Sequence, residues 1–109
     1  MSDSLWNTSN WTYIPEHWEI GTVEERIHRL RRIILLHSVL YYSMGETLVP
    51  DAQFDKWAYE LVELQKTHPE ASERVAYHRE AFADFTGETG FDLPLTDAGA
   101  IRAAERMRP

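Results

Sequence analysis

The fold class is decided by residues 22–45, TVEERIHRLRRIILLHSVLYYSMG. Their apolar residues recur at alternating spacings of three and four, which places them on one face of a helix that we expect to span residues 23–44. Thr22 and Glu25 have the spacing of a capping box, and Gly45 is typical of a helix end. Because the second half is apolar on nearly every side, we expect it to be buried and the first half to lie on the surface.

Further helices are predicted downstream. An amphipathic stripe begins after Asp51, a candidate N-cap, and runs to about Lys66. A third helix is predicted over residues 71–85, and a fourth from a cap at Thr96 to Met107. No segment alternates with a period of two for long enough to indicate a strand. The sequence therefore predicts a small all-α domain of about four helices, built on a helical hairpin.

The chain of 109 residues has room for one hydrophobic core, so we expect a single domain over residues 1–109. Its N-terminal part, residues 1–21, is rich in aromatic residues and fits no single period, which indicates an irregular arm. The hairpin follows over residues 22–70, and residues 71–109 form a C-terminal helical extension.

Composition excludes several classes of protein. The absence of cysteine excludes disulfide scaffolds, thiolate metal sites and cysteine nucleophiles. No apolar run is long enough to span a membrane, and the N-terminus lacks the features of a signal peptide, so we expect a cytoplasmic protein without a membrane partner. The net charge of −7 argues against general affinity for nucleic acid.

One local surplus of positive charge interrupts this acidic balance. Arg26, Arg29, Arg31 and Arg32 lie close together in the first predicted helix. The favoured interpretation is a solvated helix face, and the alternative is a surface that docks a phosphate or an acidic partner. Direct DNA binding is the least favoured hypothesis.

Candidate functional residues gather near the turn of the hairpin. His37 and Tyr41 are four residues apart at the end of the first helix, and Asp51 and Asp55 are four apart at the start of the second. Only a short loop separates the two helix ends. Rings and paired carboxylates are therefore expected to converge on one corner of the hairpin.

Such a corner suits a flat cationic ring that carries hydroxyl or amide groups, as in a pyridinium nucleoside. A purely structural interpretation stays open beside this one. In it, Asp51 caps its helix and Asp55 complements the helix dipole, while Tyr41, Tyr42 and Phe54 pack in the core and His37 is a hydrogen-bonded buried histidine.

Three motifs within residues 23–70 carry a resemblance: Leu40-Tyr41-Tyr42, then Val49-Pro50-Asp51-Ala52-Gln53-Phe54-Asp55, then Glu60-Leu61 followed by His68-Pro69-Glu70. Together they resemble the helical N-terminal domain Ia of bacterial NAD-dependent DNA ligases. The remainder of the chain shows no such likeness. A small stand-alone ligase-related protein of this type is expected in bacteriophage genomes.

The resemblance implies a site for the nicotinamide mononucleotide (NMN) half of NAD. It implies that Tyr41 stacks on the nicotinamide ring and that Asp51 and Asp55 hold its polar groups. Tyr42 stands where many members have a histidine that contacts the ribose-phosphate, and Phe54 where a tyrosine is usual. The candidate cofactor-binding residues are therefore His37, Tyr41, Tyr42, Asp51, Phe54 and Asp55, with NAD or NMN as a non-covalent ligand.

Ligase chemistry needs a lysine in a Lys-x-Asp-Gly setting, and neither Lys56 nor Lys66 is followed by Asp-Gly. The five histidines share no metal-binding spacing. We therefore expect no catalytic residue and no metal site, but a non-catalytic NMN-binding module that is accessory to nucleotide or DNA metabolism. The alternative is an interaction module that binds a ligase or a host protein without a nucleotide, with the four tryptophans as contacts if they are exposed.

Overall fold

The computed structural model describes residues 22–87, 90 and 92–108, and within these ranges the chain forms helices and no strand. The elements in order are α2 (Val23–Ser38), the π-helical turn η1 (Val39–Ser43), α3 (Asp51–Thr67), α4 (Pro69–Arg74), α5 (Arg79–Ala83) and α6 (Ala98–Met107). The predicted all-α class is confirmed. The aromatic arm predicted at residues 1–21 lies outside the described ranges.

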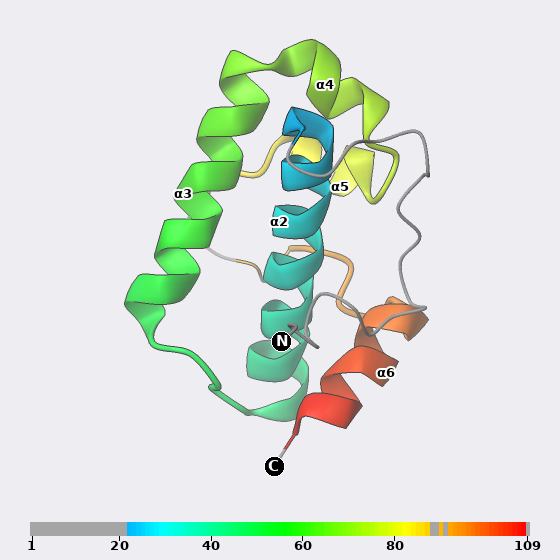
Figure 1. Cartoon of the computed structure of the whole chain (residues 1–109). Helices are drawn as coiled ribbons and strands as arrows, with labels where there is room; N and C mark the ends of the chain where they lie inside the picture. The colour runs from blue at the N-terminus through cyan, green and yellow to red at the C-terminus, as the bar shows by residue number, and fades with distance from the viewer. Residues whose placement is uncertain (1–21, 88–89, 91, 109) are drawn as a thin grey trace.

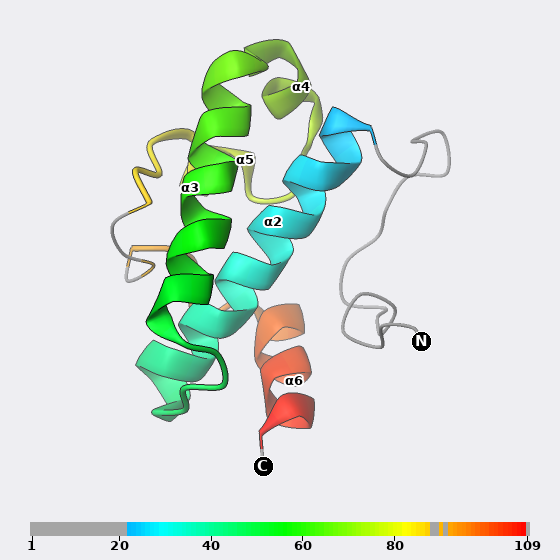
Figure 2. The ribbon, with the colours of Figure 1, turned by 60° about the vertical axis from the view of Figure 1, so that its left-hand side comes forward.

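Helix α2 is the central element (Figure 1). Helix α3 runs antiparallel along its length, α4 lies near its N-terminal end, and α6 packs near its C-terminal end and against η1 (Figure 2). The predicted helical hairpin is therefore the pair formed by α2 and α3. Within the described residues, no helix has both the length and the apolar character needed to cross a membrane.

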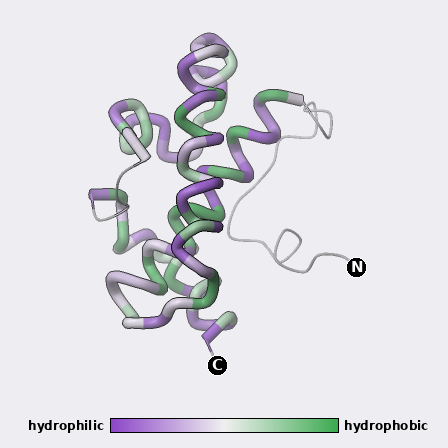
Figure 3. The backbone as a smooth tube through the Cα atoms, turned by 90° about the vertical axis from the view of Figure 1, so that its left-hand side faces the viewer, coloured by the Kyte–Doolittle hydropathy of each residue, from purple (hydrophilic) through white to green (hydrophobic). Residues whose placement is uncertain are grey.

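The core is built around α2, which is buried along most of its length. Helix α3 contributes only Ala58 and Leu61 to the fully buried set, and hydrophilic and hydrophobic stretches alternate along it in Figure 3. Helix α6 contributes three small residues to the core, Ala100, Ala103 and Ala104. The buried apolar residues are Ile27, Leu30, Ile33, Ile34, Leu35, Leu36, Val39, Leu40, Ala58, Leu61, Ala71, Val75, Phe82, Leu93, Ala100, Ala103 and Ala104.

The first half of α2 lies only partly on the surface, whereas the sequence predicted a surface position for all of it. Ile27, His28 and Leu30 are all buried, because α3 and α4 pack against this half of the helix. The hydrophobic pattern alone indicated one apolar face here, and it could not show that α4 also packs near this end of α2.

The solvated-face interpretation of the arginine cluster is wrong for Arg31 and Arg32, which are both buried. The Arg31 guanidinium donates to the carbonyl oxygens of Ser72 at 3.2 Å, Val75 at 2.8 Å and Tyr77 at 3.1 Å. It also donates to Ser72 Oγ at 2.9 Å, and to the side-chain oxygen of a neighbouring α3 glutamine. Burial lowers the pKa of Arg31 to about 10, so it stays protonated at neutral pH.

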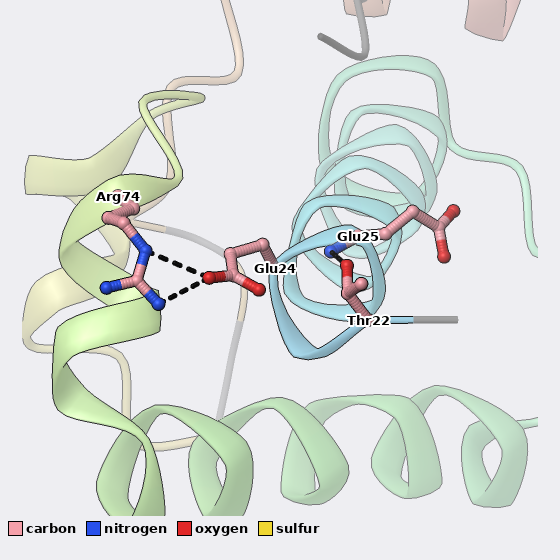
Figure 4. A network of polar contacts seen from close by, with 4 residues as sticks. All are labelled: Thr22, Glu24, Glu25 and Arg74. Atoms are coloured by element: carbon pink, nitrogen blue, oxygen red, sulfur yellow. Dashed lines mark hydrogen bonds and ion pairs between the residues drawn. The ribbon is translucent and has the colours of Figure 1, made fainter. Parts of the chain in front are cut away.

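Polar and charged residues at the start of α2 form a helix cap and ion pairs with neighbouring helices. Thr22 caps the helix as predicted, with its hydroxyl accepting from the Glu25 N–H at 3.2 Å (Figure 4). Figure 4 also shows the Arg74 guanidinium of α4 donating to the Glu24 carboxylate, with 2.9 Å from Nε to Oε2. These hydrogen bonds hold the pKa of Glu24 below its ordinary value. Arg26 makes a similar ion pair with Glu60 of α3.

The single helix predicted over residues 71–85 is wrong. Helix α4 ends at Arg74, Val75 is extended, and His78 adopts a left-handed conformation at φ 47° before α5 begins. Arg31 is the physical reason for this break, because its guanidinium donates hydrogen bonds to the carbonyl oxygens of Val75 and Tyr77. In a continuous helix these oxygens would accept from backbone N–H groups instead.

Two predicted caps are each displaced by one residue. Pro50, in the extended region, is the N-cap of α3, so Asp51 is the first helical residue rather than the cap. Asp97, rather than Thr96, caps α6, because its Oδ2 accepts from the Ala100 N–H at 2.8 Å. The other carboxylate oxygen of Asp97 lies 3.0 Å from His78 Nε2, which ties this cap to the turn before α5.

Candidate functional site

A cavity of about 240 Å³ opens at the end of the hairpin, where η1, the loop of residues 44–50 and the start of α3 meet. Its walls are His37, Ser38, Tyr41, Tyr42, Glu46, Thr47, Leu48, Val49, Asp51, Phe54 and Asp55. The structure therefore brings together around one cavity all six residues that the sequence singled out. Helix ends that meet at a short turn are the reason for this convergence.

The tyrosine wall is shaped by the way the first long helix ends. Its last residues form the wider π-helical turn η1, and turns of this kind are frequent at functional sites. Gly45 then takes the positive φ of 69° that reverses the chain, and the Glu46 N–H donates to the Leu40 carbonyl at 2.8 Å. Tyr41 and Tyr42 are left 55% and 39% exposed, with their rings edge to face at 4.8 Å.

The opposite wall is the first turn of α3. The Phe54 N–H donates to the Pro50 carbonyl at 3.2 Å, which fixes the start of the helix. Asp51 and Asp55 are exposed and lie one turn apart, so their carboxylates share a face. Both lie near the N-terminus of α3, which is the positive end of the helix dipole.

The inner part of the cavity holds a neutral histidine. His37 is 5% exposed, and burial lowers its pKa to about 4, so its ring is uncharged at neutral pH. The ring packs on Trp57 at 5.3 Å between centroids. Trp57 is not a wall of the cavity, and it supports His37 from behind.

Sequence reasoning missed part of the wall. Glu46 and the loop residues 47–49 line the cavity, as does Ser38. The loop position of Glu46 between the two converging helix ends was the signal that could have found it. Gly90 backs the Ser38 wall so closely that a Cβ atom there would lie 2.0 Å from Ser38 Oγ.

The chemistry of the cavity is aromatic and acidic. Its acidic walls are Glu46, Asp51 and Asp55, and among the described residues no lysine or arginine lines it. Its volume lies below the range of roughly 300–1,000 Å³ typical for drug-sized ligands. Within the described ranges, no group of three or more His, Cys, Asp or Glu residues is arranged to hold a metal ion.

Residues 21–74 match the family described as "DNA ligase-like, N-terminal NAD+-binding domain". This segment belongs to that family. The resemblance seen in the sequence is therefore confirmed, and every residue that lines the cavity falls inside the ligase-like domain.

Several bacterial DNA ligases are similar to the chain. The DNA ligase of Azotobacter vinelandii is 38% identical over 92 residues, which cover 79% of this chain and 11% of the ligase. That of Pseudomonas putida is 44% identical over 48 residues, and that of Bacillus subtilis 39% identical over 49 residues. The first of these alignments extends beyond residues 23–70, to which the sequence analysis had confined the likeness.

The aligned parts are a small fraction of these enzymes. The chain spans 11% of the Azotobacter ligase, 7% of the Bacillus ligase and 6% of the Pseudomonas ligase. No solved structure gave a significant match to the chain.

Proposed function

We propose that the ligase-like domain binds the nicotinamide mononucleotide half of NAD without covalent attachment. The observation that carries this proposal is the set of six residues, predicted from two separate helix ends, that line one cavity inside a segment of an NAD+-binding domain family. The aromatic and acidic character of the walls matches a ligand with a flat, positively charged ring.

Each wall residue has a part that its position allows. The exposed ring of Tyr41 offers a face on which the nicotinamide ring stacks. Asp51 and Asp55 accept hydrogen bonds from ribose hydroxyls or the carboxamide and attract the pyridinium charge. Neutral His37 offers one donor or one acceptor to the same polar groups, and Phe54 supplies an apolar wall.

We further propose a non-catalytic role, accessory to nucleotide or DNA metabolism. The family match falls on an NAD+-binding N-terminal domain, and the lysine motif of ligase chemistry does not occur in this sequence. Binding of a nucleotide, rather than its turnover, is therefore the activity to measure.

The test is a titration of the protein with NMN and with NAD, in which binding is measured by calorimetry and by NMR. Asp51→Asn and Asp55→Asn each remove the negative charge from a hydrogen-bond acceptor, and we expect about tenfold weaker binding from each, since hydrogen bonds to charged groups contribute about 1.5–3 kcal/mol. Glu63→Gln is the matched control, because Glu63 is an exposed carboxylate of the same helix outside the cavity.

A second pair of variants, one at the site and one control, tests the aromatic stacking. Tyr41→Ala is expected to weaken binding clearly, whereas Tyr59→Ala, which removes a 58% exposed ring outside the cavity, is expected to leave binding unchanged. Absence of any shift at millimolar nucleotide, or equal effects of the site and control variants, would refute the proposal.

A protein partner, either a ligase or a host protein, is the second candidate. It is favoured by the exposure of two adjacent tyrosines at one end of the hairpin, since aromatic residues are enriched in protein interfaces. The arm tryptophans on which the sequence hypothesis also rested lie outside the described residues. Binding of a purified ligase that depends on Tyr41 and Tyr42 but not on nucleotide would support this candidate.

A further inference from the structure

The proposed ligand creates an electrostatic problem at the cavity. A phosphate monoester carries a charge of about −1.5 to −2 at neutral pH. The acidic walls are the carboxylates of Glu46, Asp51 and Asp55, and no lysine or arginine is among the lining residues in the part of the chain that the structure describes. These walls favour the pyridinium ring but repel the phosphate, so a mononucleotide needs a cation at the rim.

A cation reaches this rim from the C-terminal part of the chain. Arg108 follows α6, and its Nε lies 4.0 Å from Oε2 of the wall residue Glu46. Helix α6 packs against η1, and its C-terminal end lies at the same end of the molecule as the loop of the hairpin (Figures 1 and 2). The Arg108 N–H donates to the Ala104 carbonyl at 3.1 Å, which fixes its backbone at the helix end.

The present partner of Arg108 holds it only weakly. The side chains of Arg108 and Glu46 are 47% and 31% exposed, and the contact of 4.0 Å is at the limit of an ion pair. Exposed pairs of this kind typically contribute between zero and 1 kcal/mol. A phosphate offers the guanidinium more charge and a bidentate geometry, so it competes well with this single carboxylate.

We propose that Arg108 is the residue that lets this acidic cavity accept a ligand bearing a phosphate, by moving from Glu46 to the phosphate group. The proposal rests on the proposed function, and it assigns the phosphate contact to a residue outside the ligase-like segment of residues 21–74. Arg108 thus determines the selectivity for a phosphate-bearing ligand, and the nicotinamide ring is bound without it.

The test compares two ligands that differ only by the phosphate: NMN and nicotinamide riboside. Arg108→Gln is expected to weaken NMN binding about threefold to tenfold at low ionic strength, and to leave riboside binding unchanged or slightly tighter, because Glu46 then loses its neutralising partner. Arg108→Lys keeps the charge and should retain part of the NMN affinity. Arg106→Gln, at an exposed arginine in the last turn of α6, is the matched control.

Glu46→Gln is expected to change the affinities for the two ligands in the opposite directions from Arg108→Gln. It removes a repulsive wall charge and releases Arg108, so NMN should bind more tightly while the riboside binds more weakly. Equal losses for both ligands in Arg108→Gln, or an unchanged affinity for NMN, would overturn the role of Arg108 while leaving the proposed function intact. A wild-type protein that binds neither ligand would refute both proposals.

Discussion

Replacing Arg31 by methionine tests whether the buried guanidinium holds the fold together. Arg31 is fully buried, and it donates to three backbone carbonyls between residues 72 and 77 as well as to the Ser72 hydroxyl and the Gln65 side chain. Methionine keeps much of the volume but offers no donor. The substitution therefore leaves these oxygens without their donor while leaving the apolar packing of α2 in place.

The expected loss follows from those contacts. A buried polar group that loses its hydrogen-bond partner costs about 1–3 kcal/mol, and Arg31→Met affects several such groups at once. The carbonyls of Ser72, Val75 and Tyr77 are affected together and relax together, so we expect a loss of about 3–5 kcal/mol in the free energy of unfolding. This is a large part of the roughly 5–15 kcal/mol that stabilises a typical domain, and it corresponds to a melting temperature lower by roughly 15 °C or more.

Urea unfolding followed by far-ultraviolet circular dichroism measures this loss. Arg26→Met is the matched control, because Arg26 is in the same helix but pairs with Glu60 at the surface, where a loss below about 1 kcal/mol is expected. If Arg31→Met lay within 1 kcal/mol of the wild type, the carbonyl network would have no energetic importance and our account of the break between α4 and α5 would be wrong.

Two further predictions concern stability. Burial lowers the pKa of His28 and of His37 to about 4, so the unfolded chain takes up these protons first as the pH falls. The free energy of unfolding should therefore decrease between about pH 6.5 and pH 4, by roughly 3 kcal/mol for each histidine, and His28→Gln should flatten this decrease in urea titrations at several pH values. Gly90→Ala should lose about 1–3 kcal/mol, because its Cβ would collide with Ser38, and less in a Ser38→Gly background; an equal loss in both backgrounds would contradict this contact.

The hairpin and the place of the candidate site were predictable because they depend on local patterns. The spacing of apolar residues set the first helix, Thr22 and Gly45 marked its ends, and the short loop required the helix ends to meet. Asp51 and Asp55 then had to face the end of the first helix. What these residues bind stays a prediction, since geometry shows that they converge and not what they recognise.

The local sequence pattern could not predict which arginines of the cluster are buried and which are exposed. Arg26 and Arg31 have the same side chain five residues apart, yet one is at the surface and the other is fully buried. Arg31 is buried because a connection from residues 75–78 brings carbonyl oxygens to it. That is a tertiary contact across more than forty residues, and no local rule contains it.

The two displaced helix caps are a second case in which the local sequence did not identify the right residue. Asp51 and Thr96 are both good cap residues, and each has a neighbour that adopts the cap conformation instead. At α6 the choice falls on Asp97, whose second carboxylate oxygen also contacts His78 from the preceding turn. A distant partner therefore decides between two adjacent residues of nearly equal local preference.

The cavity walls come from one continuous stretch of chain, residues 37–55, and this has a consequence for how such a site changes over time. Helix α3 is anchored in the core by Ala58 and Leu61, so insertions or deletions in the loop of residues 44–50 leave its two aspartates where they are. The loop is then free to vary in length and to alter the size and charge of the entrance. A lineage can thus acquire a new ligand preference through a handful of neighbouring codons, without rebuilding the scaffold that presents the tyrosine and the aspartates.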